Sequence, residues 1–197
     1  MLTFKVLAAL LDYPNAETVA AIPEMRAILK AEGVDAPVLL LERLERGDLL
    51  DCQAEWVDLF DRTRAGSLHL FEHVHGDSRD RGQAMVDLAG LYGRHGLTVQ
   101  ASELPDYLPA FLEFLSLLPE AEARNLLGEA VHVVEALAER VGRRNAEYGL
   151  LLAIVAGLAE GPAKPVRLAT GDMDEDIDAA WAEAEVRFGA GAALSGC

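Results

Sequence analysis

Cysteines, aromatic residues and long apolar runs are all scarce in this chain. Its 197 residues include two cysteines, Cys52 and Cys197, so no disulfide framework is implied and a reducing cytoplasm is expected. The longest apolar run, residues 149–159, is too short to span a bilayer and is typical of a buried helix. The first residues reach Asp12 too early for a good secretory signal. We therefore expect a cytoplasmic protein without a membrane-spanning segment.

Basic residues are also in short supply. The chain has 33 Asp and Glu against 17 Lys and Arg, which gives a formal net charge of −16. Such a field repels nucleic acid and anionic membranes, because phosphate binding needs clustered Lys and Arg. A cationic partner would be attracted and would meet the protein faster. Simple solubility explains the same charge, so charge alone does not choose between the two.

Runs with the period-two alternation of strands are nearly absent, whereas the helix formers Ala, Leu, Glu and Arg dominate. The pattern predicts an all-α fold with about eight helices in a single domain, 1–188, and a disordered Gly/Ala tail, 189–197. After a short apolar start at 2–11, the expected helices cover 16–32, 37–47, 48–62, a segment with Asp77 as N-cap and Asp80 as its N3 partner that ends near Gly93 or Gly96, 101–119, 120–141, 144–159 and 172–189. Residues 63–76 lack a clean helical period and are predicted to be a loop.

The densest polar stretch, FEHVHGDSRDRGQ at 71–83, raises the question of a metal site. His73 and His75 would lie on the same side of an extended loop, and Glu72 and Asp77 could complete a ligand set. A metal needs three or four converging ligands, yet the chain has only three other histidines and neither HExxH nor CxxC. Hydrogen bonding of both histidines to loop backbone is the favoured interpretation. A small metal-dependent hydrolase using His73, His75 and Asp77 is kept as an alternative.

Other catalytic patterns are missing. There is no G-x-S-x-G nucleophile motif and no glycine-rich phosphate loop, and Cys52 lies on an apolar helix stripe where packing explains it. Nothing therefore argues for an enzyme. An exposed apolar groove rimmed by acids would suit a basic amphipathic peptide, and a helical scaffold of unrelated role is the alternative.

Four stretches look like parts of one known family. Residues 55–88, EWVDLFDRTRAGSLHLFEHVHGDSRDRGQAMVDL, resemble the signature of the NarJ family, the delta subunits of respiratory nitrate reductase. ELPDYLPAFLEFL at 103–115 is similar to that family's second motif, and LLDYP at 10–14 and IDAAWAEAEVRFG at 177–189 resemble its two ends. NarJ proteins fall within the TorD/DmsD group of redox-enzyme maturation chaperones.

The resemblance implies an all-α, cytoplasmic, non-catalytic chaperone that holds no cofactor or metal of its own. Its implied partner is the N-terminal peptide, a twin-arginine leader or its remnant, of a molybdoenzyme catalytic subunit, with nitrate reductase alpha as the default client. The chaperone would hold that subunit apo until the molybdenum cofactor is inserted. Tyr107 stands where the wider group often has histidine, which fits the nitrate reductase branch.

A set of residues near these motifs is expected to contact the peptide. The apolar and aromatic candidates are Trp56, Phe60, Leu70, Phe71, Tyr107, Phe111 and Leu112, and the acidic candidates are Glu55, Glu72, Asp106 and Glu113. His73 and His75 would border the groove and could make binding sensitive to pH between about 5 and 8. For Phe111 and Leu112, burial in the core is an equal alternative.

Overall fold

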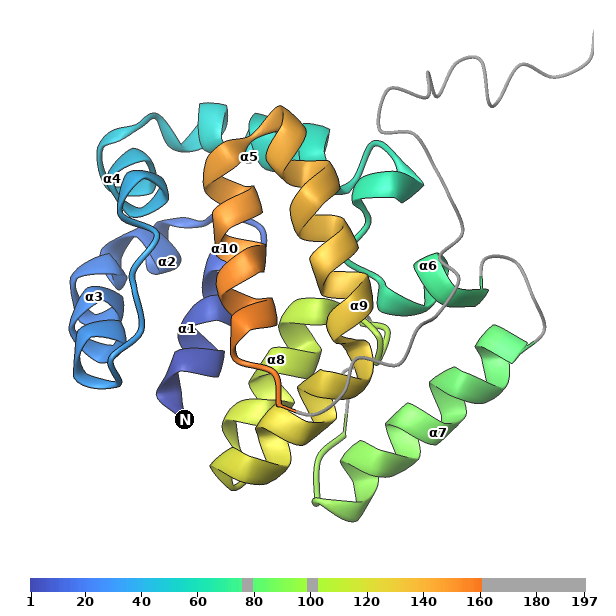
Figure 1. The fold of residues 1–197 in the computed structure, drawn as a ribbon. Helices are drawn as coiled ribbons and strands as arrows, with labels where there is room; N and C mark the ends of the chain where they lie inside the picture. Colours follow the sequence, from blue (N-terminus) through green and yellow to red (C-terminus); the bar gives the residue numbers. More distant parts are fainter. Residues whose placement is uncertain (76–79, 99–102, 161–197) are drawn as a thin grey trace, which may run out of the picture.

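The structure, a computed structural model, describes residues 1–75, 80–98 and 103–160. Within these ranges the chain is helical, with ten α-helices, one short 3-10 helix, η1 (Arg64–Gly66), and no strand (Figure 1). The predicted all-α fold is confirmed, although the helices outnumber the eight that were expected. The expected helix over 172–189, the domain boundary at 188 and the tail 189–197 lie outside the described residues.

The first half of the chain consists of short helices with local caps. These helices are α1 (Leu2–Leu11), α2 (Ala16–Ala20), α3 (Ile22–Ala31), α4 (Val38–Arg46) and α5 (Leu49–Phe60). The Asn15 side chain accepts a hydrogen bond from the N–H of Thr18 at 2.9 Å and begins α2. The Asp48 side chain accepts one from Leu50 at 2.8 Å and begins α5. Gly33 follows α3 with φ +71°, a conformation that glycine adopts readily.

The prediction of one helix over 16–32 was wrong, because the chain breaks at Ala21 into α2 and α3. Pro23 lies in the first turn of α3. Proline lacks an N–H and its ring clashes with the preceding turn, so it is tolerated at a helix start and not in the interior. The position of Pro23 therefore fixes where the second helix begins.

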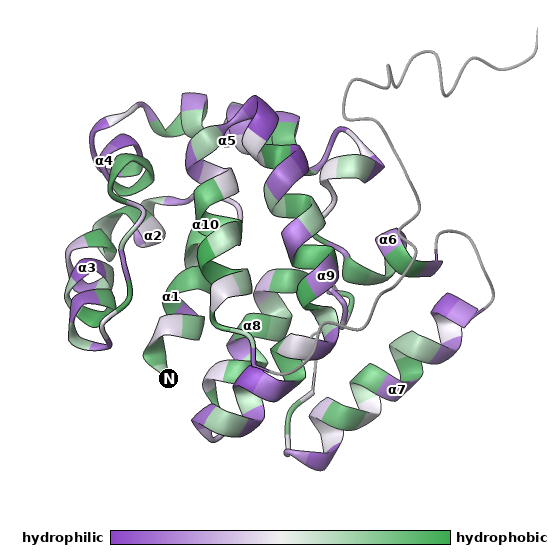
Figure 2. Cartoon of the chain, viewed as in Figure 1, coloured by the Kyte–Doolittle hydropathy of each residue, from purple (hydrophilic) through white to green (hydrophobic). Residues whose placement is uncertain are grey.

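The second half supplies the centre of the molecule. It contains α6 (Leu70–His75), α7 (Asp80–Arg94), α8 (Leu108–Ser116), α9 (Glu120–Arg144) and α10 (Ala146–Gly157). Helix α10 packs along α9, and α1 packs against α8. Figure 2 shows hydrophobic residues along α1 and α10. A Cβ atom placed on Gly149 would lie 2.4 Å from the Cα atom of Gly142, so α9 and α10 approach too closely for any side chain there.

Helix α6 lies where the sequence predicted a loop, so that prediction was wrong for residues 70–75. A carboxylate oxygen of Asp106 accepts the N–H of Phe71 at 3.0 Å, and the Asp106 carbonyl accepts the N–H of Leu70, also at 3.0 Å. These two bonds satisfy N–H groups that a helix start leaves without an internal partner. The cap comes from a residue far along the chain, so no local signal announces the helix.

Helix α7 lies at the edge of the molecule (Figure 1). Among its residues only Tyr92 is buried, and Val86 is 65% exposed. The Asp77 partner expected in its N-terminal cap lies outside the described residues. None of the helices in the described ranges has the length and apolarity needed to cross a membrane.

Candidate functional site

Three of the four NarJ-like stretches meet at one place in the structure, and the fourth, 177–189, lies outside the described residues. The indole N–H of Trp56 on α5 donates to the Leu11 carbonyl at 2.8 Å, and the Trp56 ring lies edge-on to Tyr13, with 5.4 Å between ring centroids. The hydroxyl of Tyr107, just before α8, donates to a carboxylate oxygen of Asp12 at 2.9 Å. Residues 10–14, 55–60 and 103–108 are therefore brought together by direct side-chain contacts.

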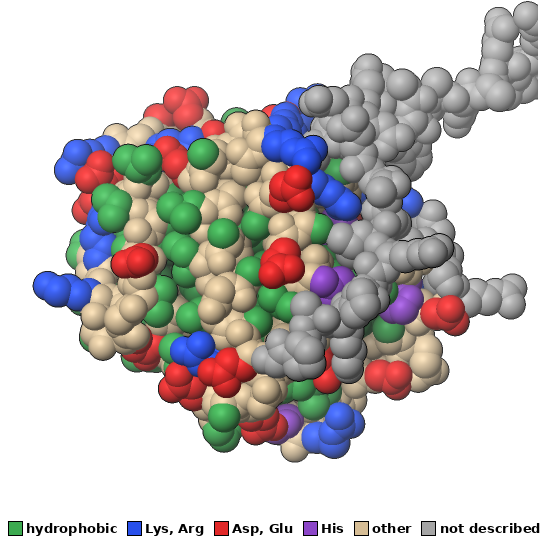
Figure 3. Space-filling view, in the orientation of Figure 1, with side chains coloured by type: hydrophobic (Ala, Val, Ile, Leu, Met, Phe, Trp, Pro, Cys, Tyr) green, Lys and Arg blue, Asp and Glu red, His purple; other side chains and the backbone are tan. Residues whose placement is uncertain are grey.

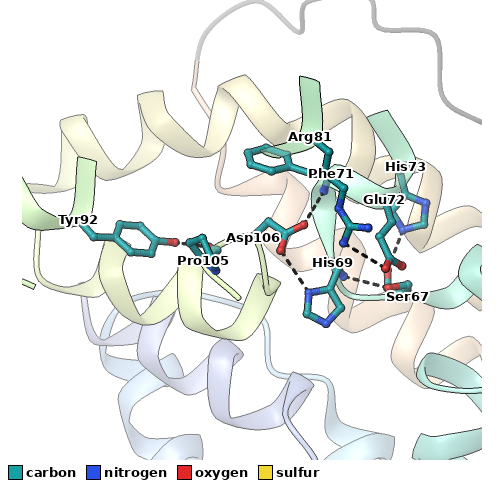
Figure 4. Close-up of polar contacts among 9 residues, drawn as sticks. All are labelled: Ser67, His69, Phe71, Glu72, His73, Arg81, Tyr92, Pro105 and Asp106. Carbon is teal, nitrogen blue, oxygen red and sulfur yellow. Dashed lines mark hydrogen bonds and ion pairs between the residues drawn. The ribbon is translucent and has the colours of Figure 1, made fainter. Parts of the chain in front are cut away.

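Asp106 is fully buried and joins two of these stretches (Figure 4). One of its carboxylate oxygens faces Nδ1 of His69 at 3.2 Å, and the other accepts the N–H of Phe71. A single antiparallel bridge pairs His69 with Tyr107, where Leu108 also donates its N–H to the Leu68 carbonyl at 2.9 Å. Asp106 thus fixes the position of α6 and of the segment before it, and its buried carboxylate is occupied by His69 and the N–H of Phe71.

His73 is also buried, with 3% of its surface exposed. Its Nε2 lies 2.7 Å from the Ser67 carbonyl, which requires Nε2–H to donate, and Arg140 approaches its Nδ1 at 3.4 Å. Burial lowers the pKa of His73 below 6.5, although the Ser67 hydrogen bond opposes this. The ring is therefore a neutral structural group that ties α6 to the chain before it.

The structure does not bring His73 and His75 together for a metal. They are two residues apart on helix α6, about 200° around its axis, where the loop prediction placed them on one side. His75 packs against Phe71 with 5.6 Å between ring centroids. Across the described residues no group of three or more His, Cys, Asp and Glu side chains could hold a metal ion. Asp77, the third member of that hypothesis, lies outside them.

A cavity of about 250 Å³ opens beside α6, and we call it the aromatic pocket. Its walls come from α5, η1, α6 and the residue before α8. It is lined by Trp56, Phe60, Asp61, Thr63, Arg64, Ser67, Leu68, His69, Glu72 and Tyr107. Four of the residues predicted to contact the peptide line this pocket: Trp56, Phe60, Glu72 and Tyr107.

Two carboxylates, Asp61 and Glu72, line the aromatic pocket together with Arg64, and further carboxylates act on Tyr107. Burial and the charges of Asp12, Glu103 and Asp61 raise the pKa of Tyr107 well above 10, which places all three carboxylates in the electrostatic surroundings of its ring. Glu72 pairs with Arg81 at 3.2 Å, whereas Asp61 is exposed at the pocket. Aromatic faces together with nearby acids attract an ammonium or guanidinium group. The pocket can therefore accept a cationic side chain.

A second cavity of about 250 Å³, the apolar groove, lies on the other side of α6. It is lined by Leu70, Phe71, Val74, Leu88, Leu91, Phe111, Leu126, Glu129, Ala130 and His132, from α6, α7, α8 and α9. Leu70, Phe71 and Phe111 were among the predicted contacts. Leu70 and Phe111 are also core residues, 3% and 5% exposed, so each contributes only a small surface to the groove. The groove can accept an apolar side chain.

The remaining predicted contacts line neither cavity. Leu112 is fully buried in the core. Glu55 forms an ion pair with Arg43 at 2.5 Å and accepts a hydrogen bond from Asn145 at 2.7 Å, so it joins α5 to α4 and to the start of α10. Glu113 is exposed in a separate cavity between α8 and the end of α7.

Sequence reasoning missed Asp12, Tyr13 and Asp61 as parts of the site. Asp12 and Tyr13 belong to the LLDYP stretch, which was recognised only as a family-like end of the chain. Asp61 directly follows Phe60, so its position beside a predicted aromatic contact was the available signal. Nothing in the sequence shows that residues 10–14 lie against α5, because that contact depends on the whole fold.

Comparisons with known proteins identify the family of this chain. The family model for the nitrate reductase delta subunit matches residues 15–153. The nitrate reductase molybdenum cofactor assembly chaperone NarJ of Escherichia coli K12 is 39% identical over 202 residues, covering 95% of this chain and 85% of NarJ. NarW of the same strain is 39% identical over 197 residues, covering 95% of this chain and 84% of NarW.

The fold also has a counterpart among solved structures. A crystal structure from Archaeoglobus fulgidus, described as a candidate redox enzyme maturation protein, matches with a TM-score of 0.56 and 22% identity. The match covers 78% of this chain and 90% of that one, and at this identity it supports the fold alone. The chain therefore belongs to the nitrate reductase delta subunit family, as its NarJ-like stretches predict, and is a chaperone of that family and not an enzyme.

Proposed function

We propose that this chain assists assembly of a nitrate reductase by binding the N-terminal segment of its catalytic alpha subunit before the molybdenum cofactor is inserted. The name of NarJ, the Escherichia coli relative, states the cofactor assembly role. The N-terminal segment as the bound region follows from the family resemblance. The observation that carries the proposal is that three NarJ-like stretches contact one another beside one aromatic pocket, which Asp61 and Glu72 line. Action in the cytoplasm stays a prediction from the sequence.

The charge of the pocket suits the basic part of a leader segment. An arginine side chain would lie against Trp56 or Tyr107, with Asp61 and Asp12 close enough to balance its charge. A cation over an aromatic face contributes about 0.5–1 kcal/mol when exposed and about 2 kcal/mol when desolvated. The net charge of −16 would speed the encounter without adding much affinity.

The apolar groove suits the hydrophobic part of the same segment. It lies across α6 from the aromatic pocket, so one peptide that crosses α6 could reach both cavities. An amphipathic helix offers apolar and cationic side chains within one or two turns. Burial of apolar surface at about 25 cal/mol per Å² would then supply most of the affinity.

Calorimetry with a synthetic client peptide tests the proposal. The peptide carries the N-terminal segment of the nitrate reductase alpha subunit, and a second version has its arginines replaced by glutamine. We expect the first to bind in a one-to-one complex and the second to bind more weakly. Tyr107→Ala should raise the Kd by roughly 30-fold, the effect of losing an aromatic anchor of about 2 kcal/mol.

Glu113→Ala is the matched control, because Glu113 is exposed in a different cavity and should leave the Kd unchanged. Thermal unfolding monitored by circular dichroism establishes that both variants are folded. Absence of any binding by the unaltered protein would support a helical scaffold of another role. Equal weakening by Tyr107→Ala and Glu113→Ala would place the peptide elsewhere.

A further inference from the structure

Glu72 on α6 lies between the two cavities. It lines the aromatic pocket together with Asp61, whereas its neighbours Phe71 and Val74 line the apolar groove. Consecutive residues of a helix point about 100° apart, so α6 presents an acid to one cavity and apolar side chains to the other. A guanidinium nitrogen of Arg81 on α7 lies 3.2 Å from the Glu72 carboxylate (Figure 4). The acid at the pocket is therefore paired with an arginine of the chain itself.

Helix α7 packs more firmly at its C-terminal end than at its start. Tyr92 is buried near that end, where its hydroxyl donates to the Pro105 carbonyl at 2.7 Å and its ring centroid lies 4.5 Å from that of Phe114. None of the described residues 80–87 is buried, and charged side chains are exposed on the outer surface at this edge of the molecule (Figure 3). Leu88 comes next and lines the apolar groove. The pair of Arg81 with Glu72 therefore holds the loosely packed start of a helix that forms one wall of the groove.

The ion pair of Arg81 with Glu72 is one that a guest cation can replace. Each of the two side chains is 25% exposed, and ion pairs that water reaches contribute little to stability. A guanidinium group that enters the aromatic pocket offers Glu72 the same partner that Arg81 provides, so the exchange leaves the number of ion pairs unchanged. The guest would also lie against Trp56 and Tyr107, which line the pocket, and these aromatic contacts favour the guest over Arg81.

We propose that Arg81 competes with the client for Glu72: it occupies this acid while no client is bound, and an arginine of the client segment displaces it. The proposal rests on the function proposed above. Once displaced, Arg81 no longer holds the first turns of α7, and the apolar groove becomes more accessible on the side of Leu88. Occupation of the aromatic pocket thus favours occupation of the groove. The two cavities together then select a segment that carries both a cationic and an apolar side chain.

Calorimetry with the client peptide tests the competition through the variant Arg81→Met. Methionine keeps an unbranched apolar stem and suits a helix, but it removes the charge and leaves Glu72 available to the guest. We expect Arg81→Met to lower the Kd about two- to fivefold, which is the range of a partly exposed ion pair. The gain should be absent for the peptide whose arginines are replaced by glutamine. It should also be absent when Glu72→Gln is present in the same chain.

Arg94→Met is the matched control, because it removes the same charge from an exposed position at the other end of α7. Its Kd should equal that of the unaltered protein, which separates the local competition from the change in net charge. If Arg81 only holds α7 in place, Arg81→Met should bind the peptide more weakly or equally well, and either result would overturn the proposal. An equal gain in Arg81→Met and Arg94→Met would overturn it too, since net charge would then explain the gain. Circular dichroism establishes that all variants are folded.

Hydrogen exchange of the protein without peptide, measured by mass spectrometry, tests the hold on α7 separately. Arg81→Met and Glu72→Gln should each speed amide exchange over 82–88, because the first turns open more often, whereas Arg94→Met should not. Unchanged exchange in the first two variants would refute the release of α7. If the peptide binds the unaltered protein and Arg81→Met brings no gain, the proposed function stands and the competition fails. If no client peptide binds the unaltered protein, the proposed function fails and the competition fails with it.

Discussion

At the scale of single residues, the side chains with the strongest polar contacts hold the site in place. Asp106 is the clearest case, because its buried carboxylate contacts both His69 and the N–H of Phe71. Asp106 was predicted to contact the peptide because it lies in the LPDYLP stretch. In the structure its side chain is fully buried and holds the start of α6 in place. Exposed Asp61, which lies in the 55–88 stretch and was not predicted as a contact, has the better position for a cationic guest.

Replacing Asp106 by asparagine should destabilise the protein. The amide keeps the shape but loses the negative charge, and one of its two polar atoms must face a group that no longer matches it. Buried hydrogen bonds to a charged group contribute about 1.5–3 kcal/mol, so we expect the free energy of unfolding to fall by about that amount. Urea unfolding measures it, with Glu113→Gln as an exposed control. Equal stability of both variants would contradict the claim that the Asp106 carboxylate stabilises the start of α6.

His73 predicts how stability depends on pH. Its pKa is lowered in the folded protein, so below pH 6.5 the unfolded chain binds the proton more readily. The free energy of unfolding should therefore fall as the pH is lowered from 7.5 to 5. In His73→Gln this fall should be smaller, because glutamine cannot be protonated and can still donate to the Ser67 carbonyl. Chemical unfolding at pH 7.5 and pH 5 measures this difference, with exposed His95→Gln as the control. An unchanged pH dependence in His73→Gln would contradict the contribution of His73 to stability.

At the scale of helices, α9 and α10 pack with their backbones in close contact at Gly142 and Gly149. A methyl group on Gly149 would overlap the Gly142 backbone, and overpacking of this kind costs about 1–3 kcal/mol. Gly149→Ala should lower the melting temperature. Gly90→Ala in α7, where a methyl group meets only the end of Arg94 at 3.9 Å, should raise stability by about 0.5–1 kcal/mol. The same direction of change in both variants would rule out this account of the helix contact.

Helices with local signals could be predicted from the sequence, and those that depend on distant residues could not. Asn15, Asp48 and Gly33 mark helix ends by their own chemistry, and each lies where it was expected. Helix α6 was missed because its cap is Asp106, 35 residues beyond Phe71. The residues of the candidate site could likewise be predicted where the signal is local and not where it depends on distant residues. Aromatic residues of the motifs lie at the pocket, whereas Glu55 and Asp106 have buried partners that only the fold reveals.

At the scale of the whole molecule, the fold separates two kinds of surface around α6. One side is the aromatic pocket with its carboxylates, and the other is the apolar groove closed by α7 and α9. A basic and apolar segment matches both sides at once, which is the physical reason to connect an acidic helical protein of this family with a leader peptide. Under the proposed function, the net charge would speed the encounter and the two cavities would supply the selectivity.

The central claim is that an arginine of the leader lies in the aromatic pocket close to Asp61. A double-mutant cycle measured by calorimetry tests it, pairing Asp61→Asn in the protein with arginine to glutamine in the peptide. We predict that each single change weakens binding by about 1 kcal/mol and that the two together cost clearly less than their sum, because they remove the same interaction. Strictly additive losses, or no loss from Asp61→Asn, would contradict the account.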